Sequence, residues 1–197
     1  MPSIIETTVF KFDELSDAAK EKARDWWRQA SIHDHWYEYT FEDVTECGAC
    51  FGITVKDIHF SGFSSQGDGA CFTGSYAYRK GGVAEVSAHT GGCETLVNIA
   101  TRLQEIQRKA FYRVVATVNH RGHYYHEYCT DIEVDTVDGA AFRTETDSEI
   151  TECLRDFMRW TYRELERAYD DYMSNEQVDE SIIMNDYTFT IEGRRFG

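Results

Sequence analysis

Two segments of the sequence carry side chains of the types that bind ligands or take part in catalysis, and the first is a glycine-rich run. FSGFSSQGDGACFTG, residues 60–74, combines glycines, serines, a glutamine and one carboxylate. Backbone N–H groups of such a loop can hold an anion, and the carboxylate can serve as a base or a ligand. The side chains expected to contact a partner or a small ligand are Ser64, Ser65, Gln66 and Asp68.

The same run also suits a structural role as the tip of a hairpin. Gly67 and Gly69 can adopt positive φ, and the Asp68–Gly69 pair is typical of a tight turn between antiparallel strands. The lysine and the glycine spacing of a Walker loop are missing. We therefore expect a hairpin tip at residues 64–69, with ligand recognition and catalysis as the alternatives.

The second segment carries residue types that bind zinc. His120, His123, His126 and Cys129 recur at intervals of three residues, and imidazole and thiolate groups are common zinc ligands. Side chains three residues apart on a strand point to opposite faces of the sheet, so these four can converge only where a turn intervenes. We therefore expect an aromatic-rich hairpin tip without a metal or another cofactor, and the alternative is a zinc site.

A row of arginines lies in the C-terminal third of the chain. Arg155, Arg159, Arg163 and Arg167 recur every four residues with acidic residues between them, so on a helix they form one row supported by ion pairs. Guanidinium groups can also bind a carboxylate or a phosphate of a partner. Arg159 and Arg163 are therefore further candidates for partner binding.

No local pattern places a nucleophile beside a histidine and an acid, as nucleophilic catalysis requires. The chain of 197 residues has six cysteines and no leader typical of secretion, which indicates reduced and mostly buried thiols rather than disulfides. Cys47 and Cys50 form one CxxC pair, but zinc sites built from such pairs need a second pair. The sequence thus favours a protein that is not an enzyme.

The charge of the chain is strongly negative and uneven. The formal net charge is −15, and residues 129–197 contribute −11 of it through 18 Asp and Glu against 7 Arg. Such a field repels nucleic acid and anionic membranes and favours basic protein surfaces. No apolar run approaches the roughly 18 residues that span a bilayer. We therefore expect a cytoplasmic protein that binds neither nucleic acid nor membrane directly.

Hydrophobic periodicity predicts the elements that position these residues. Apolar residues at helical spacing predict three main helices, at residues 12–30, 93–110 and 146–173. Thr146 and Glu149 form a capping box at the start of the last helix. Alternating runs predict the remaining regular elements: hairpins at 51–79 and 111–137, short strands at 4–10 and 187–191, and a short helix at 176–184. Residues 31–50, after a brief extension of the first helix, and residues 79–92 are predicted to be irregular.

Together these elements predict a single α+β domain over residues 1–197. Its sheet is mainly antiparallel, consists of two hairpins plus a terminal strand, and packs against the three main helices. The two candidate segments are then the tips of the two hairpins.

Three segments together resemble a known family: FDELSDAAKEKARDWWR at residues 12–28, FSGFSSQGDGACFTG at 60–74, and ESIIMNDYTFTIEGRRFG at 180–197. They resemble largely uncharacterised proteins encoded by bacteriophages and other mobile elements, some of which are labelled as antitoxins of a toxin–antitoxin stability system. The family offers no catalytic motif to match against this sequence.

The resemblance implies a phage-encoded, non-enzymatic binding protein that inhibits a host defence system in the bacterial cytoplasm, as anti-CRISPR proteins do. Its partner would be a host protein or ribonucleoprotein complex whose basic surface meets the acidic surface of this chain. One alternative is an antitoxin that neutralises a toxin protein. The other is a nucleotide-binding protein or hydrolase that uses the loop from Ser64 to Gly69.

Overall fold

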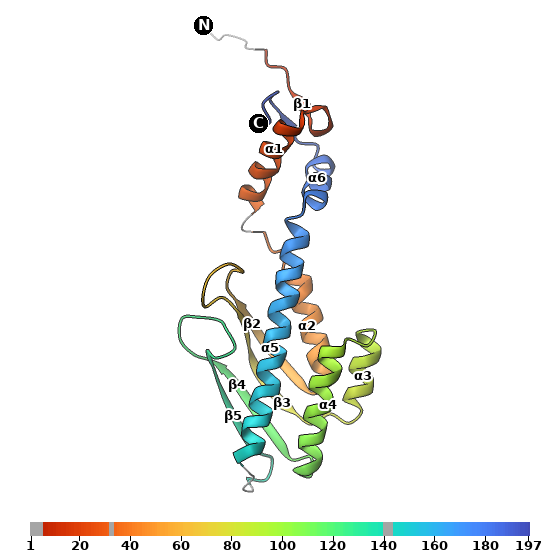
Figure 1. The fold of residues 1–197 in the computed structure, drawn as a ribbon, viewed down its shortest axis with the longest axis vertical. Coiled ribbons are helices and arrows are strands. Elements are labelled where there is room, and N and C mark those ends of the chain that lie inside the picture. The colour runs from red at the N-terminus through yellow and green to blue at the C-terminus, as the bar shows by residue number, and fades with distance from the viewer. Residues whose placement is uncertain (1–5, 32–33, 140–143) are drawn as a thin grey trace. The chain divides into compact units, whose positions relative to one another are not determined.

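The computed structural model describes residues 6–31, 34–139 and 144–197, and it has the predicted α+β class (Figure 1). The chain forms two compact units: the larger unit comprises residues 37–166, and the smaller unit comprises residues 1–36 and 167–197. Each unit has a hydrophobic core of its own. Whether the two units fold as a single domain over residues 1–197 stays a prediction.

The larger unit is built on a four-stranded antiparallel sheet with the order β2-β3-β4-β5. Its strands are β2 (Ile53–Phe60), β3 (Ala70–Ala77), β4 (Val114–His120) and β5 (Thr130–Thr136). The two predicted hairpins are therefore confirmed. They join side by side because β3 pairs with β4, with Gly74 opposite Val118. This arrangement leaves β2 and β5 as the two edges of the sheet.

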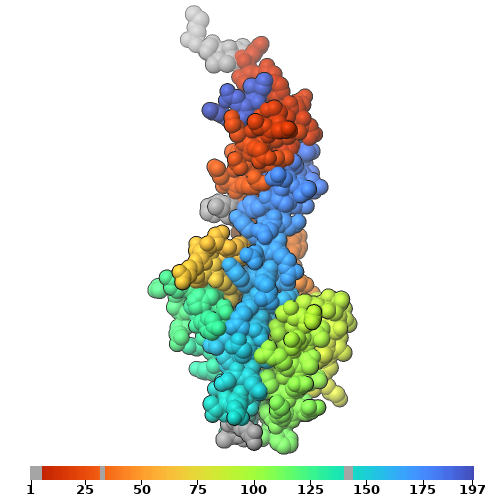
Figure 2. Space-filling view, viewed as in Figure 1, coloured from red at the N-terminus to blue at the C-terminus, as the bar shows by residue number. Residues whose placement is uncertain are grey.

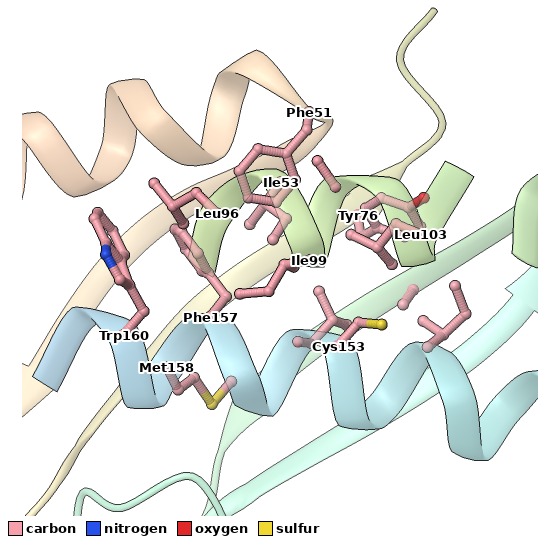
Figure 3. Close-up of a cluster of buried hydrophobic side chains, with 14 of the residues drawn as sticks. Phe51, Ile53, Tyr76, Leu96, Ile99, Leu103, Cys153, Phe157, Met158 and Trp160 are labelled. Carbon is pink, nitrogen blue, oxygen red and sulfur yellow. The ribbon is translucent and has the colours of Figure 1, made fainter. Parts of the chain in front are cut away.

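Helices cover one face of this sheet (Figure 1). They are α2 (Glu38–Cys50), α3 (Gly82–His89), α4 (Glu94–Lys109) and the part of α5 (Thr144–Tyr172) that lies in the larger unit. Figure 3 shows Phe157 of α5 pointing into the core; its ring lies 5.7 Å from the rings of both Phe51 and Phe72. Burial of each such side chain stabilises the fold by roughly 1.5–3 kcal/mol.

Two segments that were predicted to be irregular are helices, so those predictions were wrong. In α2 the buried positions are Val44, Cys47, Gly48 and Cys50, and most of the remaining residues are polar and exposed. In α3 only Gly82 and Val86 are buried. Such short and weakly apolar stripes give little helical signal, and packing against the rest of the larger unit decides their conformation.

The start of α5 also differs from the prediction. The helix includes Thr144, so Thr146 lies within the first turn and cannot cap it, and the predicted capping box is wrong. In this part of the chain the first-turn carboxylates Glu145 and Asp147 still favour the helix, because they lie near the positive end of its dipole.

The smaller unit contains β1 (Phe10–Lys11), a short 3₁₀ helix η1 (Phe12–Glu14), α1 (Asp17–Ala30), α6 (Asn175–Met184) and β6 (Thr188–Phe189). The terminal strand β6 does not extend the large sheet; it pairs antiparallel with β1. β1 begins at Phe10, and the first part of the strand predicted at residues 4–10 lies outside the described residues. Arg24 of α1 holds Asp179 of α6 through two hydrogen bonds of 2.6 and 2.7 Å.

No helix in the described part of the chain is both long and apolar enough to cross a membrane.

Candidate functional site

The two predicted tip segments meet in the structure and form what we call the hairpin-tip cluster: residues 61–69, residues 121–129, and Arg159 and Tyr162 of α5. Figure 2 shows the first loop, in gold, against the second loop, in green. A Cβ on the buried Gly69 would lie only 2.6 Å from Cα of His126. The hydroxyl of Tyr162 donates to the carbonyl of Gly62 over 3.0 Å. The sequence thus predicted the two tips, and tertiary packing joins them to α5.

Asp68 holds the first loop together from inside. Its carboxylate accepts hydrogen bonds from the N–H groups of Ser65 (2.7 Å) and Ser64 (3.0 Å). These two donors, with help from the hydroxyl of Ser61, hold the pKa of Asp68 below its ordinary value. The backbone N–H groups of Ser64 and Ser65 therefore bind the chain's own carboxylate, and recognition of an external ligand by this loop stays a prediction. Gln66, which lies between Ser65 and Asp68 in the sequence, is exposed.

The expected tight turn at Asp68–Gly69 is wrong. Residues 61–69 form a longer loop, closed where the N–H of Ser61 donates to the carbonyl of Gly69 over 3.1 Å. Gly67 has a φ of +96°, as predicted, but Gly69 does not have positive φ. The glycine at position 69 is explained by the close approach of His126, which leaves no space for a side chain.

Arg159 belongs to this cluster and uses its guanidinium within the chain. It forms ion pairs with Glu127 (2.9 Å), Glu152 (2.7 Å) and Asp156 (2.7 Å), and it donates to the hydroxyl of Tyr128 over 3.1 Å. These contacts fix the second loop to α5. Arg163, the other arginine singled out in the sequence, is exposed one turn further along the helix.

The histidines of the second tip separate into different environments. His126 lies beside Cys129, with its Nε2 atom 3.3 Å from the sulfur. Nε2 of His120 donates to the carbonyl of Tyr124 over 3.0 Å, and the ring of His120 packs against that of His59. His123 is exposed. Within the described residues, these four predicted ligands do not gather three donor atoms at one point.

The buried thiols are poor nucleophiles. Burial raises the pKa of Cys47, Cys71 and Cys153 to about 12, from an ordinary value of 9.0. A thiol with such a pKa is almost entirely protonated at neutral pH, and the thiolate is the reactive form. In the metal-free protein these three cysteines therefore suit packing better than nucleophilic catalysis.

A groove that the sequence did not predict runs along the edge of the sheet beside α2. Its volume is about 560 Å³, and its lining consists of Phe41, Glu42, Thr45 and Glu46 from α2 and Val55, Lys56, Asp57, Ile58 and His59 from β2. Five consecutive residues of β2 line it, from both faces of the strand, so the groove follows the strand's outer edge. The groove was missed because residues 31–50 were predicted to be irregular.

A second feature that the sequence did not predict lies where α2 and α3 meet. The carboxylate of Asp43, the sulfur of Cys47 and the imidazole of His89 place one donor atom each within 4.8 Å of one another. Asp43 and Cys47 are one turn apart on α2, and His89 is the last residue of α3. The spacing of Asp43 and Cys47 is visible in the sequence, but their proximity to His89 depends on how α3 packs.

A family model described as a domain of unknown function (DUF8835) matches residues 36–175. No curated protein and no solved structure matches the chain. The matched range contains the hairpin-tip cluster, the groove and the Asp43–Cys47–His89 group. Because the match spans well over half of the chain, the chain belongs to this family.

Proposed function

We propose that this member of the DUF8835 family is a non-enzymatic binding protein that takes an extended, basic segment of a partner protein into the groove between α2 and β2. The observation that carries the proposal is the composition of the groove, which combines an open strand edge with acidic and apolar side chains.

The open edge of β2 supports recognition of an extended segment. β2 is an edge strand, so one side of its backbone has no partner strand within the sheet. A peptide that adds a strand at such an edge gains main-chain hydrogen bonds, while its alternate side chains enter neighbouring pockets. Phe41, Val55 and Ile58 supply apolar contacts for those side chains.

The charges that line the groove support a basic occupant. Glu42 and Glu46 of α2 and Asp57 of β2 contribute three carboxylates. The lysine of the lining, Lys56, lies 3.8 Å from the carboxylate of Asp57 and offsets part of that charge. A lysine or arginine of the partner would therefore enter a negative site, which favours basic over acidic segments.

The resemblance of the sequence to phage and mobile-element proteins suggests the biological setting. In that setting the partner is a component of a host defence system with a basic surface, and binding blocks its action. A toxin protein is the alternative partner. Co-expression separates the two, because the first predicts rescue of phage growth under immunity and the second predicts relief of toxicity from a neighbouring gene product.

The groove itself is tested with a labelled short peptide that alternates lysine with valine, measured by fluorescence polarisation against the full chain. We expect saturable binding that weakens roughly tenfold from low to high salt, because the attraction is electrostatic. The same peptide with N-methylated backbone amides should bind at least tenfold more weakly, because it cannot form the ladder of hydrogen bonds.

A matched pair of charge reversals locates the binding site. Glu42→Lys, in the groove, should weaken binding roughly tenfold. Glu133→Lys, which is exposed on the opposite edge strand β5, changes the net charge equally and should leave binding within about twofold. Equal effects of the two substitutions, or equal binding of the N-methylated peptide, would refute the groove as the site.

A further inference from the structure

Two adjacent helices of the larger unit bring together an unusual mixture of donor groups. Asp43 and Cys47 lie on one face of α2 because residues four apart on a helix are neighbours. His89 ends α3, and it completes a group in which oxygen, sulfur and nitrogen donors lie within 4.8 Å of one another. Cys47 is buried, whereas Asp43 and His89 are exposed. The group is therefore open to solvent from one side.

The distances are close to those of a tetrahedral metal site. Zinc ligands at about 2.0–2.3 Å from the ion stand roughly 3.3–3.8 Å from one another. The sulfur of Cys47 is already 3.9 Å from the carboxylate of Asp43. Rotation of the exposed Asp43 and His89 side chains, which moves their donor atoms by about one ångström, would bring all three donors to coordination distance.

A fourth ligand is available from the same helix. The carboxylate of Glu46 lies 3.9 Å from Nε2 of His89. Asp43, Glu46 and Cys47 thus occupy positions i, i+3 and i+4 of α2, which share one face. Four ligands from protein side chains are typical of closed, structural zinc sites, whereas catalytic sites leave one position open.

We propose that Asp43, Glu46, Cys47 and His89 form a structural zinc site that ties α2 to α3. The mixture of thiolate, imidazole and carboxylate selects zinc over calcium or magnesium, which bind through oxygen ligands. Binding displaces the proton of the Cys47 thiol to solvent and forms a zinc–sulfur bond. Burial, followed by the charge of Asp43, raises the pKa of the Cys47 thiol, and a divalent cation bound to the sulfur favours the thiolate form.

The site is tested on the full chain after treatment with a chelator and a reductant. We expect one equivalent of zinc to bind and to raise the melting temperature. Cobalt in its place should give the charge-transfer absorption of a cobalt–thiolate bond. Absence of stoichiometric zinc binding, or a cobalt complex without that absorption, would overturn the proposal.

Variants identify the ligands. His89→Ala and Asp43→Asn change exposed side chains, and each should weaken zinc binding at least tenfold while the metal-free protein keeps its melting temperature. Cys47→Ser should abolish the cobalt–thiolate absorption. If the buried serine prevents folding, the two exposed variants decide the question. Wild-type affinity in both of them would overturn the assignment.

Control variants address the other histidine-rich region. His123→Ala and Cys129→Ser lie in the second hairpin tip and should leave zinc binding unchanged. Loss of zinc in Cys129→Ser with retention in His89→Ala would place the metal at the hairpin tip and overturn the site on α2.

Discussion

Gln107 is a fully buried amide that connects α4 to the sheet, and its replacement gives a sharp test of the larger unit. Its Nε2 group donates to the carbonyl of Val114 over 2.6 Å and to the hydroxyl of Tyr76 over 3.3 Å. Its Oε1 atom accepts from the N–H of Val114 over 3.2 Å. The side chain thus pairs with the backbone at the first residue of β4, much as a neighbouring strand would.

Gln107→Met keeps the length of the side chain and removes all three hydrogen bonds. Each buried polar group left without a partner costs about 1–3 kcal/mol. The N–H of Val114 loses its hydrogen-bond acceptor and pays the full desolvation penalty. The carbonyl of Val114 and the hydroxyl of Tyr76 regain part of the lost free energy through other contacts or water, and the methionine side chain adds apolar burial. We therefore expect the free energy of unfolding to fall by about 2–4 kcal/mol, a large share of a typical 5–15 kcal/mol.

The measurement is urea unfolding followed by circular dichroism, with hydrogen exchange of the Val114 amide as the local reporter. Gln104→Met is the matched control, because Gln104 is exposed on the same helix and its replacement should change stability by less than about 0.5 kcal/mol. Tyr76→Phe completes a double-mutant cycle and should show coupling to Gln107→Met. A loss below about 1 kcal/mol, or unchanged exchange at Val114, would refute this account.

Two further predictions concern the hairpin tips and the thiols. Gly69→Ala should lower stability by about 1–3 kcal/mol in thermal unfolding, because the added Cβ would lie 2.6 Å from Cα of His126. Gln66→Ala in the same loop is the control and should be neutral. Equal melting temperatures of the two variants would contradict the close approach. Burial raises the pKa values of Cys47, Cys71 and Cys153 to about 12 in the folded protein, against 9.0 ordinarily. The contribution of these thiols to stability should therefore be constant below pH 9 and fall between pH 9 and 12, where only the unfolded chain loses these protons. A flat urea midpoint up to pH 11 would contradict that prediction, and at pH 8 the folded protein should be alkylated at the partly exposed Cys93 and Cys129 before these three.

Local sequence patterns were sufficient to predict the helices and strands whose apolar residues recur with a clear period. Alternating β-branched and aromatic residues predicted both hairpins, and apolar stripes predicted the helices that became α1, α4 and α5, because each such segment must bury one face. Weak stripes failed at α2 and α3, where few residues are buried and neighbours supply the stability.

The hairpin-tip cluster was predicted only in part. The two tips and Arg159 were singled out from residue type, and they do lie together. Their contacts were not predictable, since Asp68 binds its own loop and Arg159 binds the acidic residues around it. Composition identifies a group that can form a strong interaction, but the partner it finds depends on which chain segments are adjacent.

By itself the sequence determined the α+β class, the hairpins, the main helices and the strong negative charge, because each depends on composition or on a repeat within a few residues. Only the tertiary structure decided which strands form the edges, where α2 lies beside β2, how Gln107 reaches β4, and that His89 stands next to Asp43 and Cys47. Those contacts join segments tens of residues apart, and their formation depends on the packing of the whole core rather than on any local pattern.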